Sequence, residues 1–249
     1  MEMKIATYNI WHAQDYSLYL KGEKKINPEN IARYIWENDI SICALQEVDV
    51  NHKRSEFINT PGVIADYLSK KSGEKYYYEY AASILGYANE GSQYGNAIIS
   101  KYPIKNVRKI KVDVGMGIKD EYEPRIFLIA DVEAEDKKIT VIATHFGIRE
   151  SEKQLAVERL QDILKEIDGH VIFMGDLNNE PGSYIYSQIS RMLVDSCSDI
   201  NLPLTFSSDN PRYKIDYIFT SADIKAKNVY TSPLKYSDHL PLCATIEIL

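Results

Sequence analysis

Several common features are missing from this sequence of 249 residues, and each absence removes a class of protein. The three cysteines, Cys43, Cys197 and Cys243, lie far apart and form no C-x-x-C pair, which excludes a disulfide scaffold and a cysteine-rich zinc site. No apolar run reaches 18 residues, and "MEMKIATYNI" has no basic region followed by a long apolar one. We therefore expect a cytoplasmic protein with reduced thiols, without a membrane span or a signal peptide.

An excess of positive charge is also lacking. Lysine and arginine total 29 against 36 aspartates and glutamates, which gives a net charge of −7. The whole molecule therefore has no electrostatic attraction to nucleic acid or to anionic membranes. A local basic patch or a bound metal ion would reverse this sign within a cleft, so nucleic acid remains an alternative partner that the charge does not favour.

No repeat, low-complexity segment or linker rich in Pro, Gly or Ser divides the chain, so residues 1–249 are expected to form a single domain, and we expect a monomer. Apolar residues make up 45% of the chain, enough for a sizeable core. Strand-like runs cover residues 4–10, 40–48, 76–83, 95–100, 106–112, 125–133, 138–146, 170–176, 214–221, 224–231 and 242–248. Helical patterns between them predict two sheets packed face to face with helices outside.

The helices have recognisable ends. Residues 27–38 begin with Asn27, a residue suited to capping, and Pro28; residues 60–73 end in Gly73. The third helix is expected to begin with a capping box formed by Ser151 and Gln154. Its apolar stripe consists of Ala156, Leu160, Ile163, Leu164 and Ile167. A fourth helix is expected near residues 183–193.

Polar residues stand where several expected strands stop. They are Asn9, Glu47, His145, Asp176, Asn178, Asp216, Asp238 and His239. Each has an ordinary structural explanation on its own: a buried amide, a solvated rim carboxylate, a core histidine or a turn residue. "GDLNNEP", residues 175–181, has a typical turn composition. Asp216 is harder to explain in this way, because a carboxylate inside an apolar strand must find partners.

Taken together, these residues predict chemistry. Two acids and an amide at one rim suit Mg²⁺, which takes oxygen ligands and keeps water for a substrate phosphate. Asp176 and Asn178 are two residues apart, so an extended backbone would point both to one side. Two histidines supply proton chemistry near neutral pH. The set fits hydrolysis of a phosphate ester, and no serine or cysteine nucleophile motif competes with it.

The order of these residues resembles the endonuclease/exonuclease/phosphatase superfamily, which includes deoxyribonuclease I, abasic-site endonucleases, neutral sphingomyelinases, inositol polyphosphate 5-phosphatases and deadenylases. The resemblance covers residues 4–248, and "GDLNNEP" followed by a late "SDHLPL" is its most specific part. It implies an α/β fold: a four-layer α/β sandwich of two mostly antiparallel sheets packed face to face with helices outside.

The resemblance also implies a metal centre. Glu47 would be the main ligand of Mg²⁺, for which Mn²⁺ would substitute, with Asn9 and Asp238 close by. Asp176 would align or deprotonate the attacking water, and Asn178 would hold a phosphate oxygen.

The remaining roles concern charge and protons. Asp216 would hydrogen-bond His239 and favour its charged form, and His239 would contact the phosphate or manage the proton. His145 would do the same across the site, so both histidines are expected to be charged. Arg125 is a candidate clamp for a phosphate oxygen, although a surface salt bridge explains it nearly as well.

Departures from better-known members narrow the function. "MGDLNNEP" and "KIDYIF" differ from the 5-phosphatase patterns, and Tyr213 and Lys214 stand where abasic-site enzymes have Trp-Arg. The motif is closer to sphingomyelinase-like and deadenylase-like members. We expect a metal-dependent hydrolase of phosphodiesters or small phosphorylated head groups. A nuclease acting on DNA or RNA is the alternative, and a catalytically silent binding module is a remote one.

Overall fold

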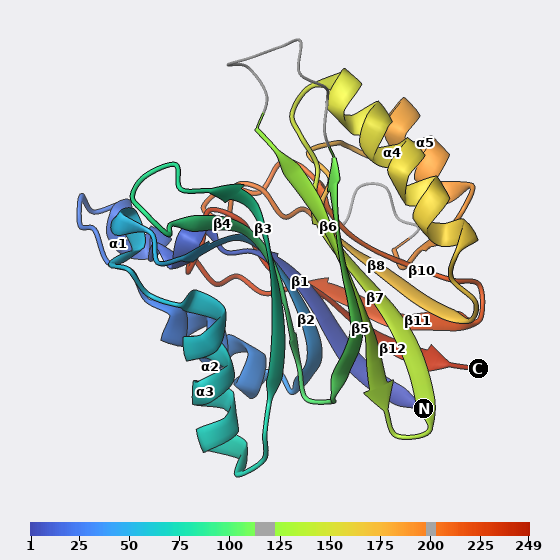
Figure 1. Ribbon diagram of the computed structural model, residues 1–249, viewed down its shortest axis with the longest axis horizontal. Coiled ribbons are helices and arrows are strands. Elements are labelled where there is room, and N and C mark those ends of the chain that lie inside the picture. Colours follow the sequence, from blue (N-terminus) through green and yellow to red (C-terminus); the bar gives the residue numbers. More distant parts are fainter. Residues whose placement is uncertain (113–122, 198–202) are drawn as a thin grey trace.

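The computed structural model describes residues 1–112, 123–197 and 203–249, and these residues form two six-stranded sheets (Figure 1). The first sheet has the order β11-β12-β1-β2-β4-β3. Its strands are β1 (Glu2–Asn9), β2 (Ile40–Val50), β3 (Tyr77–Leu85), β4 (Gln93–Ser100), β11 (Ile224–Thr231) and β12 (Leu242–Ile248). Only the β1–β2 pairing is parallel within it.

The second sheet has the order β5-β6-β7-β8-β10-β9. Its strands are β5 (Ile104–Val112), β6 (Arg125–Ala134), β7 (Lys137–His145), β8 (His170–Asp176), β9 (Val194–Asp195) and β10 (Asp216–Thr220). Here only β7 and β8 run parallel. Each sheet is therefore mostly antiparallel with one central parallel pair, whose two carboxyl ends lie at the same edge.

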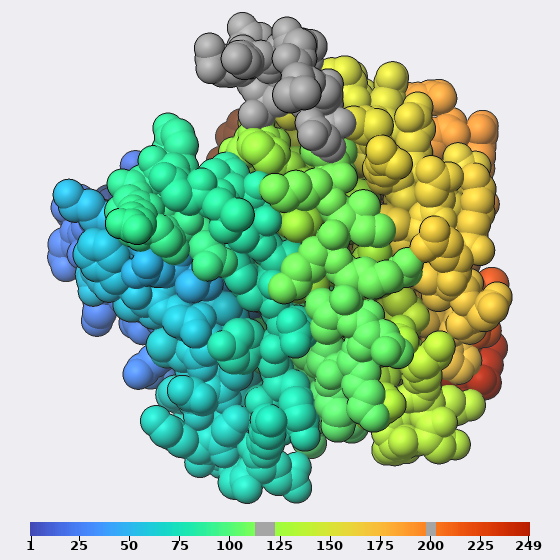
Figure 2. Space-filling view, in the orientation of Figure 1, coloured from blue at the N-terminus to red at the C-terminus, as the bar shows by residue number. Residues whose placement is uncertain are grey.

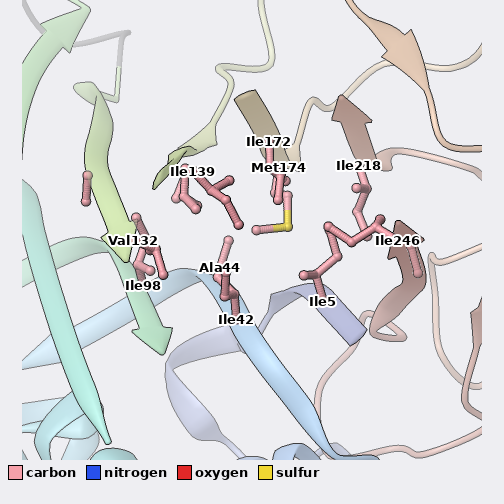
Figure 3. Close-up of a cluster of buried hydrophobic side chains, with 14 of the residues drawn as sticks. Ile5, Ile42, Ala44, Ile98, Val132, Ile139, Ile172, Met174, Ile218 and Ile246 are labelled. Carbon is pink, nitrogen blue, oxygen red and sulfur yellow. The ribbon is translucent and has the colours of Figure 1, made fainter. Parts of the chain in front are cut away.

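The two sheets bury their facing sides against each other. Figure 3 shows Ile42, Ala44 and Ile98 of the first sheet opposite Val132 and Met174 of the second. Alternate residues of each strand point to opposite faces, so the same strands have a second apolar face to cover. That requirement places helices on both outer sides.

Helices cover both outer faces and complete four layers (Figure 1). On the first sheet α2 (Pro28–Glu37) and α3 (Thr60–Ser72) bury Ile35 and Leu68; on the second α4 (Glu150–Lys165) and α5 (Tyr184–Ser190) bury Leu160 and Ile189. The short helix α1 (Tyr16–Tyr19) and two 3-10 turns, η1 (Trp11–Ala13) and η2 (Lys53–Ser55), lie in loops. This confirms the predicted four-layer α/β sandwich. None of the described helices has the length and apolar character needed to span a bilayer.

The predicted start of one helix was wrong, and the predicted cap of another makes no hydrogen bond. Helix α4 begins two residues earlier than expected, with Arg149 and not Ser151 at the N-cap. The N–H of Arg149 donates to the carboxylate of Glu152 (3.0 Å), so Ser151 and Gln154 do not form the capping box. Asn27 stands at the N-cap position of α2, but its side chain makes no capping hydrogen bond. The predicted end of α3 is confirmed, with Gly73 in the left-handed conformation at φ 75°.

Candidate active site

The strand order brings the predicted polar residues to one edge of the sandwich. In the parallel pair β7–β8, His145 lies opposite Asp176, and in β8–β10 Asp176 lies opposite Asp216. Asn9 ends β1 on the facing sheet, and its amide nitrogen donates to Asp176 Oδ2 across the sheet interface (3.1 Å). Residues far apart in the chain therefore meet because both parallel pairs end at the same place.

Asn9 is fully buried and holds two carboxylates. Its Nδ2 donates to Glu47 Oε1 (3.0 Å) as well as to Asp176. Its Oδ1 accepts from the N–H of Trp11 (3.2 Å). Asn9 therefore lies beside Glu47 as expected, but it presents a donor to the site and turns its oxygen to the backbone.

His239 is buried between two aspartates. Its Nδ1 is hydrogen-bonded to Asp216 Oδ2 (2.9 Å), which confirms the predicted contact, and its Nε2 lies 3.6 Å from Asp176 Oδ2. Burial lowers the pKa of His239, but Asp216, Asp176 and Asp238 outweigh burial and raise it to about 10. His239 is therefore an imidazolium at neutral pH, and its Nδ1–H donates to Asp216. In this state the 3.4 Å approach of Nε2 to Asn9 Nδ2 joins two donors and is not a hydrogen bond.

Asp176 lies at the end of β8, and its neighbours shift its pKa in opposite directions. Burial and the charge of Asp216 raise its pKa to about 6, while His239 and the hydrogen bonds from Asn178 and Asn9 lower it. At pH 7 Asp176 is mostly a carboxylate. Asp176, Asp216 and His239 offer ligand atoms within 4.8 Å of one another, a geometry that suits a metal ion, although a charged His239 has no free lone pair there.

Glu47 was predicted to lie at the end of its strand, but it lies inside β2, at a bulge. The β2–β4 register shifts between Leu45 and Val48, and Glu47 has φ 55°, a conformation that non-glycine residues rarely adopt. The bulge turns the Glu47 side chain toward the cleft. Burial raises its pKa to about 7, the hydrogen bond from Asn9 lowers it, and nearby Asp238 raises it again.

His145 corrects the prediction of two charged histidines. It is buried, and burial together with the positive charges of Arg125 and His239 lowers its pKa well below the usual range. His145 is therefore neutral at pH 7. Its Nε2 lies 3.1 Å from Asn178 Nδ2, which makes Nε2 the acceptor and places the hydrogen on Nδ1. This buried atom has no hydrogen-bond partner in the part of the chain that the structure describes.

The backbone after β8 is not extended, so the argument that two-residue spacing aligns Asp176 with Asn178 was wrong. Asn178 has φ 47°, and its N–H donates to Asp176 Oδ1 (2.8 Å) in a tight turn. Its side chain nevertheless reaches the cleft and also donates to the carbonyl of Phe146 (3.0 Å). "GDLNNEP" is thus both a turn and part of the site.

Arg125 begins β6 inside the cleft and is not a surface residue. It is 7% exposed and pairs with Glu123 at 3.0 Å, while its Nε has no hydrogen-bond partner among the described residues. Asp238 is half-buried, and its Oδ1 accepts from Ser237 Oγ (3.1 Å). Burial raises the pKa of Asp238.

These groups surround a cleft of about 1230 Å³, and the sequence analysis missed part of its lining. The missed residues include His52, Arg54 and Tyr94, and also Phe206, whose ring lies 4.7 Å from that of His239. In the sequence, these residues are indicated only by two basic residues shortly after Glu47, His52 and Arg54, and by Tyr94 directly before "GNAIIS". Neither marks a site without knowledge that β2 and β4 are paired.

One known protein family matches most of the chain. The sequence model of the Endonuclease/Exonuclease/phosphatase family matches residues 6–239. No curated protein sequence matches the chain.

Solved structures share the fold at low sequence identity. An endonuclease/exonuclease/phosphatase from Beutenbergia cavernae DSM 12333 has TM-score 0.78 and 18% identity over 99% of this chain and 72% of its own. A family protein from Leptotrichia buccalis C-1013-b has TM-score 0.77 and 24% identity over 98% and 99%. A mannosyl-6-phosphatase from Bacteroides thetaiotaomicron VPI-5482 has TM-score 0.72 and 18% identity over 98% and 99%.

Proposed function

The chain belongs to the endonuclease/exonuclease/phosphatase family, and we propose that it hydrolyses phosphate esters with the help of a divalent metal ion, Mg²⁺ by preference and Mn²⁺ as a substitute. The observation that carries this proposal is the position of buried His239, which is hydrogen-bonded to Asp216 (2.9 Å) and lies 3.6 Å from Asp176 in a cleft that Glu47 also lines. A protonated imidazole beside a carboxylate that lines the cleft is suited to a phosphate group and an attacking water.

The donor set fits a hard cation. Glu47 and Asp238 both line the cleft, and burial raises the pKa of each more than the nearby charge of His239 lowers it, so a bound cation would stabilise both carboxylates. We assign the metal to these two, with Asn9 orienting Glu47. When bound, the ion would polarise the phosphate and offset its negative charge.

Asp176 is our candidate for orienting the water. Its two oxygens are fixed by Asn9 and by the N–H of Asn178, so the carboxylate cannot rotate. With a pKa of about 6 it is ionised at neutral pH and close enough to that range to accept a proton.

His239 and Arg125 are our candidates for binding the phosphate. His239 keeps Nδ1 on Asp216 and directs Nε2–H toward the cleft. Arg125 brings a second positive charge to the same cleft, and Asn178 brings an amide. The neutral His145 orients Asn178 through Nε2. These charges oppose the charge that develops in the transition state.

The test is turnover of bis-p-nitrophenyl phosphate by the purified chain with Mg²⁺, with Mn²⁺ and with a chelator. We expect release of p-nitrophenol that the chelator stops and added Mg²⁺ restores. Absence of turnover on phosphodiesters and on phosphomonoesters under all three conditions would refute the proposal and favour a silent binding module. Turnover confined to DNA or RNA would favour the nuclease alternative.

A further inference from the structure

One wall of the cleft carries polar side chains that the proposed hydrolysis does not use. His52 and Arg54 follow β2, and Tyr94 lies on β4. All three line the same cleft as Glu47 and His239. We call them the β2–β4 wall.

Arg54 is held rigidly in this wall. Its Nε donates to Asp49 Oδ2 (2.8 Å) and its Nη2 to Asp49 Oδ1 (2.9 Å), and Asp49 is fully buried. The guanidinium also lies over the ring of Tyr94, 5.2 Å from its centre. Nη1 makes no hydrogen bond with any described residue, and the side chain is 39% exposed. Arg54 therefore presents one fixed donor edge.

His52 and Tyr94 add hydrogen-bonding groups beside it. The N–H of Arg54 donates to His52 Nδ1 (3.1 Å), so in the neutral ring Nε2 carries the hydrogen. Burial and the charge of Arg54 lower the pKa of His52, which keeps the ring neutral at pH 7. The hydroxyl of Tyr94 has no partner among the described residues. The wall thus offers three groups that can donate to acceptor atoms of a ligand.

The charge around the wall disfavours a second anion. Arg54 is already neutralised by Asp49. Burial is the main cause that raises the pKa of Tyr94 well above its usual value, so its hydroxyl is an uncharged donor. Neutral acceptors, such as hydroxyl groups, fit this wall better than a second phosphate or a carboxylate.

Apolar side chains stand at the rim of the cleft. Tyr87, in the loop between β3 and β4, is 86% exposed, and Ile148, in the loop after β7, is 74% exposed. The β3–β4 loop projects at the upper left of Figure 2 and is anchored by Asn89, which donates to the Asn51 carbonyl (2.9 Å) and accepts from the Lys53 N–H (3.0 Å). Such faces pack against the C–H faces of a ring, as apolar pocket linings do.

We infer that the β2–β4 wall binds the organic part of the substrate, and that this part is a hydroxylated ring such as a sugar or a cyclitol. The inference rests on the proposed function, since it names the substrate class of the same cleft.

The test uses p-nitrophenyl phosphodiesters that share the reactive phosphate and differ only in the second ester. Esters of glucose, galactose and inositol carry hydroxylated rings, a cyclohexyl ester carries none, and a 4-carboxycyclohexyl ester carries an anion. We expect kcat/KM for the best hydroxylated ester to exceed that for the cyclohexyl ester by about 10-fold, the effect of one or two hydrogen bonds.

Two variants test whether the β2–β4 wall causes the preference for hydroxylated esters. Tyr94→Phe removes only the hydroxyl, and Arg54→Lys keeps a positive charge beside Asp49 while removing the fork, so both are designed to fold. Each should lower the ratio of kcat/KM for the best hydroxylated ester to kcat/KM for the cyclohexyl ester by about threefold or more. Tyr78→Phe, which removes a hydroxyl on β3 outside the cleft lining, should leave the ratio unchanged.

The possible results distinguish failure of this inference from failure of the proposed hydrolytic function. No turnover of any ester would refute the proposed function itself. Equal turnover of cyclohexyl and hydroxylated esters, or a ratio unaffected by both variants, would refute the inference alone. Preference for the carboxylate ester, lost in Arg54→Lys, would also refute it and would assign the wall to an anion.

Discussion

Side chains of the same type carry different charges at the floor of the cleft, because their neighbours differ. Burial lowers the pKa of His145, and Arg125 and His239 lower it further. His239 is equally buried, yet Asp216 and Asp176 raise its pKa to about 10. The two histidines look alike in the sequence. Only the register of β7, β8 and β10 determines which one faces carboxylates, so their charges could not be predicted from the sequence.

His239 and Asp216 should act as one unit. Removing either partner breaks the same 2.9 Å hydrogen bond, so the losses in kcat for His239→Ala and Asp216→Asn should be well short of additive. The measurement is a double-mutant cycle on kcat/KM with bis-p-nitrophenyl phosphate. Fully additive losses would mean that this contact has no role in the reaction.

The pKa of Glu47 predicts how metal binding depends on pH. With a pKa of about 7 in the metal-free protein, Glu47 is increasingly protonated below pH 7, and a protonated carboxyl does not ligate Mg²⁺. Affinity for the ion should therefore rise from pH 6 to pH 8, and binding near pH 7 should release protons.

Calorimetry with Mg²⁺ or Mn²⁺ in buffers of different ionisation enthalpy measures both quantities. Glu47→Gln, which cannot titrate, should bind weakly and lose this part of the proton release. Affinity in the unmodified chain that is constant from pH 6 to pH 8 would contradict the assignment of Glu47 as a ligand.

Strands and helices followed from the sequence wherever an apolar pattern was long enough to define them. The buried runs of β2, β7 and β8 and the stripe of α4 placed these elements correctly. The errors came from backbone features with no apolar signature. The bulge at Glu47 depends on the pairing of β2 with β4, and the left-handed turn at Asn178 depends on a hydrogen bond to Asp176.

Gly175 is required for β7 and β8 to lie side by side next to the site. A Cβ at this position would lie 2.1 Å from the carbonyl oxygen of Thr144 on β7. Gly175→Ala should therefore separate the strands that position His145 and Asp176. We expect a loss of roughly 1–3 kcal/mol in the free energy of unfolding, measured by thermal or urea unfolding, together with lower kcat.

Gly169→Ala is the matched control before the other end of β8. Gly169 has φ 98° but no atom within 4 Å of an added Cβ, so only backbone strain is introduced, far from the chemistry. Activity should survive in this variant. Unchanged stability and activity in Gly175→Ala would contradict the close approach of β7 and β8.

The whole molecule combines a predictable architecture with a less predictable cleft. The four layers follow from apolar runs with two buried faces, and the family resemblance drew attention to the residues that we propose as catalytic. The β2–β4 wall and the burial of Arg125 depend on packing between distant segments, and no local pattern of the sequence reveals them.

Net charge leads to a prediction about substrates. A duplex-DNA binder neutralises several phosphates with lysine and arginine, so its binding falls steeply with salt. This chain carries −7, and its cleft contains acids as well as Arg54 and Arg125. Small phosphate esters should be cleaved faster than plasmid or duplex DNA, with little change between two salt concentrations. Fast, strongly salt-sensitive cleavage of DNA would contradict this expectation and favour a nuclease.

The most direct test of the proposed function is the hydrolytic rate of Asp176→Asn in the presence of saturating Mg²⁺. The substitution preserves the shape of the side chain but removes the carboxylate that we assign to the attacking water. We predict a loss in kcat of about 100-fold or more, with an unfolding transition that shows the variant still folded. Near-normal kcat in a folded Asp176→Asn protein would contradict the proposed mechanism.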